Sequence, residues 1–151
     1  MTEIKMTSIN YEDLKEFVFS SFVAMGLNKL DAEIFSDALM FSELRFLPGQ
    51  GQGVQRITTY FKRIQNKEVN LNSDYEIIKE SSSLALVDAK NGIGTIQASK
   101  CMDIAIQKAQ NEGIGKVIIK NSTHFGSSSV HAVKAANQNC IGVVYTNAGP
   151  E

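Results

Sequence analysis

Cysteine and histidine are scarce in this sequence, which contains two residues of each type among 151. Cys101 and Cys140 lie far apart, without the CxxC spacing or nearby histidine of a zinc site, so we expect reduced thiols in or near the core. Long apolar runs are also missing. The stretch from Phe17 to Met25 is interrupted by serines and is far shorter than the ~20 residues that cross a bilayer. We therefore expect no membrane span.

No sign of charge dominates the sequence. The 15 basic and 16 acidic residues give a formal net charge of −1, and Lys and Arg form no dense cluster that would follow a phosphate backbone. We therefore expect no binding of nucleic acid. The first residues include Glu3 and Lys5 and lack the apolar core of a signal peptide, which indicates a cytoplasmic protein.

Residues 1–72 are predicted to form a helical subdomain. Apolar residues at helical spacing predict helices over residues 11–25, 29–44 and 54–66. Asn10 and Asn28 precede the first two helices and are suited to cap them. Between the second and third helix, residues 48–53 alternate glycine with glutamine behind a proline and must form a loop. This loop lacks the Gly-Lys-Ser/Thr ending of a nucleotide-binding P-loop.

Residues 73–151 are predicted to form an α/β subdomain. Apolar runs bounded by turn residues predict strands over residues 75–79, 84–88, 116–120 and 141–145, and helices over residues 94–112 and 128–139. The alternation of strand, helix and strand predicts crossover units. The predicted fold class is therefore α/β, with a helical subdomain followed by a mixed sheet with crossover helices. The chain ends soon after its last predicted strand, so we expect a fold that is incomplete at the C-terminus.

His124 is the strongest candidate for a chemical role. It follows the apolar run 117–119 and precedes Gly126, which would allow a ligand to approach the backbone closely. Imidazole exchanges protons near neutral pH, which suits proton transfer to and from a hydroxyl. An equally weighted alternative is a loop histidine whose ring bonds backbone carbonyls. The second histidine, His131, is expected on the surface of a helix.

Two further motifs are candidates for binding a ligand, one a carboxylate and the other a dinucleotide. Arg56 follows the glycine loop, where a guanidinium could clamp a carboxylate, although an exposed helix arginine is the simpler interpretation. Gly92 and Gly94 begin a GxG pattern, but Gln97 stands where a dinucleotide fingerprint has its third glycine. These glycines are therefore expected to form a strand-to-helix turn and not a standard Rossmann site.

Several motifs occur in a recognisable order: VDAKNGIG at 87–94, NSTHFG at 121–126, IG at 141–142 and TNA at 146–148. In this order they resemble the type 2 malate/L-lactate dehydrogenase family, which includes ureidoglycolate, sulfolactate and diketogulonate enzymes and does not have the Rossmann fold. The resemblance implies interconversion of a small 2-hydroxy acid and its 2-oxo acid with a nicotinamide cofactor, NAD or NADP. It implies that His124 is the catalytic proton donor or acceptor, and that residues 73–151 form the first part of the nicotinamide-binding subdomain.

The resemblance also implies binding residues and a partner. Arg56, Gln52 and His131 match substrate-binding positions, Asn147 and Ala148 match a cofactor contact, and members of the family are commonly homodimers. Gly51 and Gln52 replace the serine and histidine of the family motif, and the chain is about half the family's length. We therefore expect the chain alone to be inactive and to bind cofactor weakly or not at all. The alternative is a non-catalytic remnant or dimerisation module of the same fold.

Overall fold

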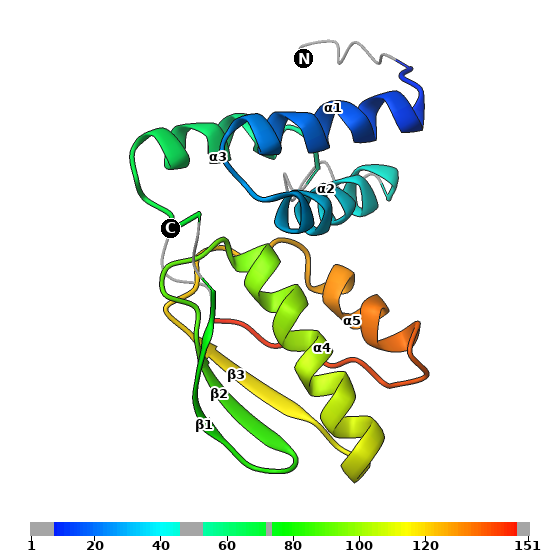
Figure 1. The fold of residues 1–151 in the computed structure, drawn as a ribbon. Helices are drawn as coiled ribbons and strands as arrows, with labels where there is room; N and C mark the ends of the chain where they lie inside the picture. The colour runs from blue at the N-terminus through cyan, green and yellow to red at the C-terminus, as the bar shows by residue number, and fades with distance from the viewer. Residues whose placement is uncertain (1–7, 46–52, 72–73, 148–151) are drawn as a thin grey trace.

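The computed structural model describes residues 8–45, 53–71 and 74–147, which form two layers (Figure 1). The first layer is helical and contains α1 (Tyr11–Ala24), α2 (Lys29–Leu44) and α3 (Arg56–Gln65). The second layer contains β1 (Glu76–Glu80), β2 (Leu84–Asp88), α4 (Gly94–Glu112), β3 (Lys116–Lys120) and α5 (Ser128–Ala136). The predicted order, helices first and a sheet with helices second, is confirmed.

The predicted starts of α1 and α2 are confirmed by their caps. Asn10 Oδ1 accepts hydrogen bonds from the backbone N–H of Glu12 at 2.8 Å and of Asp13 at 3.3 Å. Asn28 Oδ1 accepts one from the backbone N–H of Asp31 at 2.9 Å. Such bonds satisfy N–H groups that have no partner inside the helix. Local sequence alone therefore sets where both helices begin.

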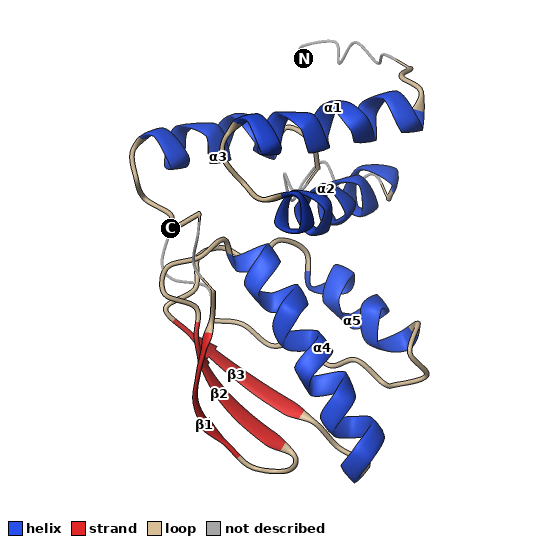
Figure 2. Cartoon of the chain, viewed as in Figure 1, coloured by secondary structure: helices blue, strands red, loops and turns tan. Residues whose placement is uncertain are grey.

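The sheet is mixed, and its strand order in the described part is β1-β2-β3 (Figure 2). β1 and β2 pair antiparallel as a hairpin. β2 and β3 pair in parallel, with Ala85 opposite Val117 and Val87 opposite Ile119. Parallel neighbours need a crossover connection, and α4 provides it. The predicted mixed sheet with a crossover helix is therefore confirmed.

The sheet is packed on one face by the described residues. On that face Ala85, Val87 and Cys101 of α4 form a small buried cluster. On the other face Leu84 and Ile118 are 50% and 52% exposed, and a cavity of about 340 Å³ lies among side chains of the three strands. The described part of the chain thus leaves an apolar sheet surface uncovered.

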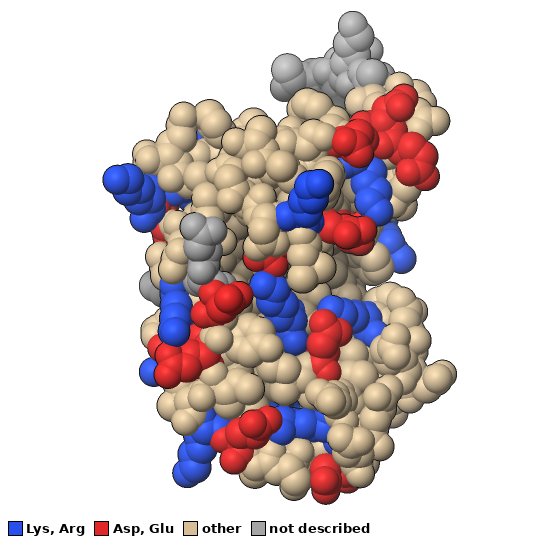
Figure 3. All heavy atoms as spheres, viewed as in Figure 1, with Lys and Arg blue, Asp and Glu red and all other residues tan. Residues whose placement is uncertain are grey.

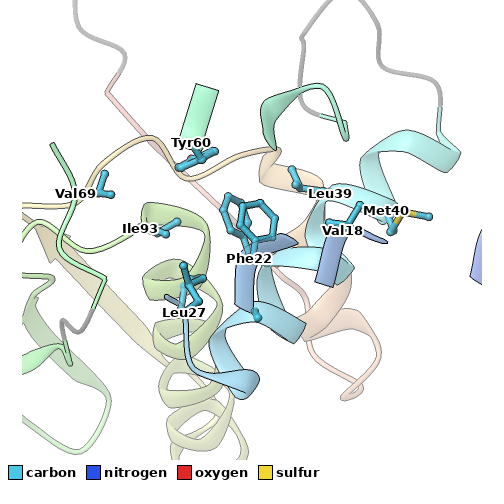
Figure 4. Packing of buried hydrophobic residues seen from close by; sticks show 11 residues of the cluster. Val18, Phe22, Leu27, Leu39, Met40, Tyr60, Val69 and Ile93 are labelled. Carbon is cyan, nitrogen blue, oxygen red and sulfur yellow. The ribbon is translucent and has the colours of Figure 1, made fainter. Parts of the chain in front are cut away.

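The main core lies where the two layers meet, and aromatic rings form its centre. Phe22 of α1 stacks on Phe35 of α2 with 4.4 Å between ring centroids, and Phe35 meets Tyr60 of α3 edge-on at 4.6 Å. Ile93 and Ile96, at the start of α4, belong to the same cluster, part of which Figure 4 shows from close by. The start of α4 therefore completes the core of the helical layer.

A buried ion pair also joins the layers. Lys100 Nζ of α4 lies 2.7 Å from Asp31 Oδ1 of α2, and the two side chains are 17% and 6% exposed. A buried charge is costly unless it is paired, so removal of either partner would leave the other uncompensated. The pair therefore favours one placement of α4 against α2.

The prediction of a strand over residues 141–145 is wrong. This segment is extended but pairs with no strand among the described residues, and Ile141 and Tyr145 are 95% and 90% exposed. A strand needs a neighbour for its backbone N–H and C=O groups, and in the described part β3 pairs only with β2. Apolar alternation identifies residues that suit a strand, but it does not supply a partner.

Smaller differences concern the helices. Phe17 and Phe61, apolar residues of the helices predicted over residues 11–25 and 54–66, are 62% and 44% exposed. The last helix, α5, ends at Ala136 instead of Asn139. It ends there because Asn139 has a φ of 58°, Cys140 donates its backbone N–H to Ala135 O at 3.1 Å, and Asn139 donates its own to Ala136 O at 3.0 Å, a pattern that ends a helix.

The surface carries both signs of charge. On the face that Figure 3 shows, Lys and Arg alternate with Asp and Glu over both layers. Several of these residues form ion pairs, such as Lys15 with Asp37 at 2.7 Å and Lys134 with Asp103 at 2.6 Å. Among the helices of the described residues, none has both the length and the apolar character that crossing a membrane requires.

The aromatic core gives a test of the fold. Phe35→Ala should lower the free energy of unfolding by about 3–5 kcal/mol, because it removes a fully buried ring and leaves a cavity. Phe17→Ala is the matched control, since Phe17 is 62% exposed, and it should change the stability by less than about 1 kcal/mol. Urea unfolding followed by circular dichroism measures both values. Equal losses in the two variants would contradict the described core.

Candidate active site

His124 lies in the loop of residues 121–127, which connects β3 to α5. Asn121 opens this loop with a φ of 53° and donates a hydrogen bond from Nδ2 to Asp88 Oδ2 at 2.9 Å. Asn121 O accepts a second bond, from the backbone N–H of Asn91 at 2.8 Å. Because β2 and β3 are parallel, their carboxyl ends lie side by side, and these bonds join the loops that leave them.

Thr123 clamps the same loop onto the turn between β2 and α4. The backbone N–H of Gly94 donates to Thr123 Oγ1 at 3.0 Å, and Thr123 Oγ1 donates to Gly92 O at 3.1 Å. The approach is so close that a Cβ on residue 94 would collide with the backbone oxygens of Thr123 and His124. Glycine is therefore required at position 94 by the loop that carries His124.

This contact also occupies the N-terminus of α4. A Rossmann-type dinucleotide site places the pyrophosphate at the N-terminus of the helix that follows the first strand. Here the N–H of Gly94 is already bonded to Thr123 Oγ1, and a Cβ on residue 94 would meet the backbone oxygens of Thr123 and His124. The glycines at 92 and 94 form the predicted turn between β2 and α4, and one N–H at the start of α4 is taken by Thr123.

Tyr60 of α3 supports the His124 loop from the helical layer. Its hydroxyl donates a hydrogen bond to His124 O at 3.2 Å, and the side chain is 2% exposed. Burial raises the pKa of Tyr60, so the hydroxyl keeps its proton and remains a donor. In the sequence, Tyr60 is only one of the apolar residues of the helix predicted over residues 54–66. Tyr60 lies four residues after Arg56, about one helical turn, so the two side chains are on the same side of the helix. This spacing was the sequence signal that could have assigned Tyr60 to the site.

The His124 ring is held by its own loop. The backbone N–H of Gly126 donates to His124 Nδ1 at 3.3 Å, and Gly126 has a φ of 80°, which favours glycine. Because Nδ1 accepts this bond, the neutral ring carries its proton on Nε2. The pKa of His124 is lowered by partial burial, and further by the positive charges of Arg56 and Arg63. His124 is therefore mainly neutral at pH 7.

A cavity of about 280 Å³ lies beside His124, lined by Arg63, Glu68, Val69, Thr123 and His124. Arg56 does not line this cavity, but it lies near enough to act on the pKa of His124. Sequence analysis missed Arg63. It lies seven residues after Arg56, about two turns of α3, so the two guanidinium groups share one side of the helix. The cavity wall therefore combines His124 with Arg63 and Glu68, and a second cation, Arg56, lies nearby.

His131 does not lie on the surface, as the sequence had suggested. It is 1% exposed, its Nε2 lies 2.9 Å from Phe125 O, and its ring stacks on that of Phe125 at a centroid distance of 5.4 Å. The apolar residues of α5 gave no sign of this, because the packing partner comes from the loop before the helix. His131 is near His124 through Phe125, although it does not line the cavity.

The other predicted contacts are not brought to this cavity. Gln52 and Ala148 lie outside the described residues. Asn147 is exposed and is not among the residues that line the cavity. No group of three or more His, Cys, Asp or Glu side chains that could hold a metal ion occurs among the residues that the structure describes.

Comparison with known sequences gives a consistent result. The pattern of the malate/L-lactate dehydrogenase family matches residues 9–151. Malate dehydrogenase of Pyrococcus abyssi is 36% identical over 139 residues, and L-sulfolactate dehydrogenase of Methanocaldococcus jannaschii is 32% identical over 139 residues. These alignments cover 92% of this chain but 38% and 40% of the two relatives. The chain thus spans about two fifths of their length.

Solved structures show the same similarity. Malate dehydrogenase from Pyrococcus horikoshii OT3 superimposes with a TM-score of 0.83 at 32% identity, covering 91% of this chain and 40% of that one. The sulfolactate dehydrogenase from Methanocaldococcus jannaschii gives 0.82 at 29% identity, covering 87% and 38%. The α/β fold, the loop that carries His124 and the sequence match lead to one conclusion: the chain belongs to the malate/L-lactate dehydrogenase family.

Proposed function

We propose that this protein is an oxidoreductase that interconverts a small 2-hydroxy acid and its 2-oxo acid with a nicotinamide cofactor. The observation that carries the proposal is the His124 imidazole beside a cavity whose wall includes Arg63. An imidazole and a guanidinium are the groups that such a substrate needs, one for its oxygen and one for its carboxylate. The relatives named malate dehydrogenase, L-sulfolactate dehydrogenase and 2,3-diketo-L-gulonate reductase support this assignment.

Substrate binding is assigned to the cations of α3. Arg63 lines the cavity, and Arg56, one of the two cations that act on His124, is proposed to complete the site by clamping the carboxylate through two parallel hydrogen bonds. Gln52 remains a proposed substrate contact. His131 is too deeply buried to touch a molecule in the cavity, so its role must be exerted through the loop.

The described residues suit only the reacting end of a nicotinamide cofactor. The cavity of about 280 Å³ is slightly smaller than typical ligand pockets, which measure ~300–1,000 Å³. This volume is enough for a small acid or a nicotinamide ring but not for a dinucleotide. The bond from the Gly94 N–H to Thr123 Oγ1, at the N-terminus of α4, supports a non-Rossmann mode of binding. Asn147 and Ala148 remain proposed contacts, to NAD or NADP. When bound, the cofactor supplies or accepts the hydride.

His124 is proposed to move the proton. During reduction its imidazolium form gives the Nε2 proton to the former carbonyl oxygen while the carbon gains hydride. During oxidation a bare Nε2 accepts the hydroxyl proton as hydride leaves. The neutral ring of the structure has its proton on Nε2 and can donate a hydrogen bond to a carbonyl oxygen. The imidazolium and the base form both carry a proton on Nδ1, so proton transfer in either direction requires release of the bond from Gly126.

The remaining expectations concern the whole protein. We propose that further sequence completes the fold, because the relatives are longer and one sheet face is uncovered by the described residues. A homodimer and a cytoplasmic location stay predictions. The alternative of a non-catalytic remnant depends on Gly51 and Gln52, which lie outside the described residues, whereas His124 and its cavity favour an enzyme.

Activity tests the proton role. In the complete gene product, His124→Gln should lower turnover of 2-oxo acids by about 10²–10⁴-fold, because an amide bonds the substrate oxygen but transfers no proton. Loss of reduced nicotinamide absorbance measures turnover, first with a panel of 2-oxo acids to find the substrate. Lys79→Gln, on β1, is the control and should behave like the parent. Full activity of His124→Gln would refute the role.

The carboxylate clamp gives a second test. Arg56→Lys should raise KM about tenfold with a smaller change in kcat, because an ammonium group cannot make two parallel hydrogen bonds to a carboxylate. Arg45→Lys, an exposed arginine at the end of α2, is the matched control. Steady-state kinetics separates the two constants. A KM that stays unchanged in Arg56→Lys would show that another group binds the carboxylate.

The lowered pKa of His124 can be measured without substrate. The chain has two histidines, so NMR resolves the titration of each ring. Arg63→Gln should raise the pKa of His124, because it removes a cation that disfavours imidazolium, whereas Lys79→Gln should not. In the active protein, the imidazolium needed for reduction disappears as pH rises through this pKa. The fall in reduction rate should therefore move to higher pH in Arg63→Gln, and an unmoved pKa would contradict the described geometry.

A further inference from the structure

The peptide group between Phe125 and Gly126 is hydrogen-bonded at both ends by imidazole rings. Its carbonyl oxygen lies 2.9 Å from His131 Nε2, and its N–H donates to His124 Nδ1 at 3.3 Å. A carbonyl oxygen only accepts, so His131 must carry its proton on Nε2. The two histidines are thereby connected through a single peptide group, and rotation of that group would break both bonds.

His131 also holds Phe125 by its side chain. The two rings stack with an interplanar angle of 15°, and His131 is among the most deeply buried large side chains of the described residues. Its Nδ1 is buried and has no hydrogen-bond partner among the described residues. A buried polar side chain is costly, so the bond to Phe125 O is the contact that compensates for its presence in the core.

We propose that His131 is a positioning residue that selects the proton position on His124 through the Phe125–Gly126 peptide. The bond from His131 Nε2 to Phe125 O fixes which way the peptide faces. The peptide N–H then points at His124 Nδ1, which must stay an acceptor, and the proton of the neutral ring remains on Nε2. Hydrogen bonds on the two sides of one amide also polarise each other, which strengthens the selection.

The consequence for the reaction rests on the proposed function. A proton on Nε2 of His124 allows the ring to donate a hydrogen bond to a substrate carbonyl oxygen before hydride transfer. If the peptide were free to rotate, His124 would also adopt the form with its proton on Nδ1, which cannot donate from Nε2. Transfer of the proton needs imidazolium, whose Nδ1–H cannot accept the bond from Gly126, so the peptide held by His131 opposes that later step. His131 would thus act on carbonyl binding and on proton transfer without touching the substrate.

The test separates the hydrogen bond from packing. His131→Phe keeps a ring that can stack on Phe125 but removes the Nε2 donor. His131→Gln loses the stack but places an amide N–H near the position of Nε2. Ring ¹⁵N chemical shifts of His124 in the chain report which nitrogen carries the proton. Circular dichroism and thermal melting establish that each variant is folded.

The expected pattern is specific. In the parent chain and in His131→Gln, the His124 proton should reside mainly on Nε2. In His131→Phe the ratio of the two ring forms should fall about tenfold, the factor that corresponds to one net hydrogen bond. An unchanged ratio in His131→Phe would overturn the proposal, and so would a change in His131→Gln as large as in His131→Phe, because that would make stacking the cause.

A third variant decides the matter if His131→Phe does not fold. Phe125→Leu removes the stack but keeps the backbone carbonyl, so the His124 proton should stay on Nε2, and a shift to Nδ1 would overturn the proposal. These measurements need neither substrate nor cofactor. Absence of turnover in the complete protein would refute the proposed function and leave the positioning result intact. Conversely, an unchanged ratio of the two ring forms in His131→Phe would refute the positioning role and leave the proposed function intact.

Discussion

The loop that carries His124 depends on its close contact with the N-terminus of α4. Thr123 bonds to Gly92 and Gly94, and the backbone approaches so closely that residue 94 has no space for a Cβ. This contact places the end of β3 against the start of α4, beneath the helical layer. It positions the imidazole and brings Tyr60 within reach of the loop.

The two layers contribute different parts of the site. The helical layer provides the cations Arg56 and Arg63, together with the buried hydroxyl of Tyr60. The α/β layer provides the imidazole and the glycines that hold its loop. The layers also share one aromatic and aliphatic core, which keeps these groups at a constant distance. In this fold the separation between cation and imidazole is thus set by core packing.

Arg56 and Arg63 have opposite effects on two proposed steps, the binding of the substrate carboxylate and the protonation of His124. They attract a carboxylate, but they also disfavour the imidazolium form of His124. A bound carboxylate would offset part of their charge, so substrate binding and proton uptake by His124 would favour each other. The ring would then be neutral in the free protein and more easily protonated once a 2-oxo acid is present.

The sequence by itself determined the elements whose causes are local. Asn10 and Asn28 cap their helices with side chains two or three residues away from their partners, and the β2-α4-β3 unit follows from strand and helix periodicity. The family motifs identified His124 and Arg56. Only the tertiary structure decided the burial of His131, the contacts of Tyr60 and Arg63 with the site, and the absence of strand pairing at residues 141–145. Each of these depends on a contact outside its own element: Phe125 for His131, the His124 loop for Tyr60 and Arg63, and a pairing strand, which residues 141–145 lack among the described residues. Contacts between distant segments leave no periodic signal in one sequence, because any apolar or polar residue of suitable size can make them.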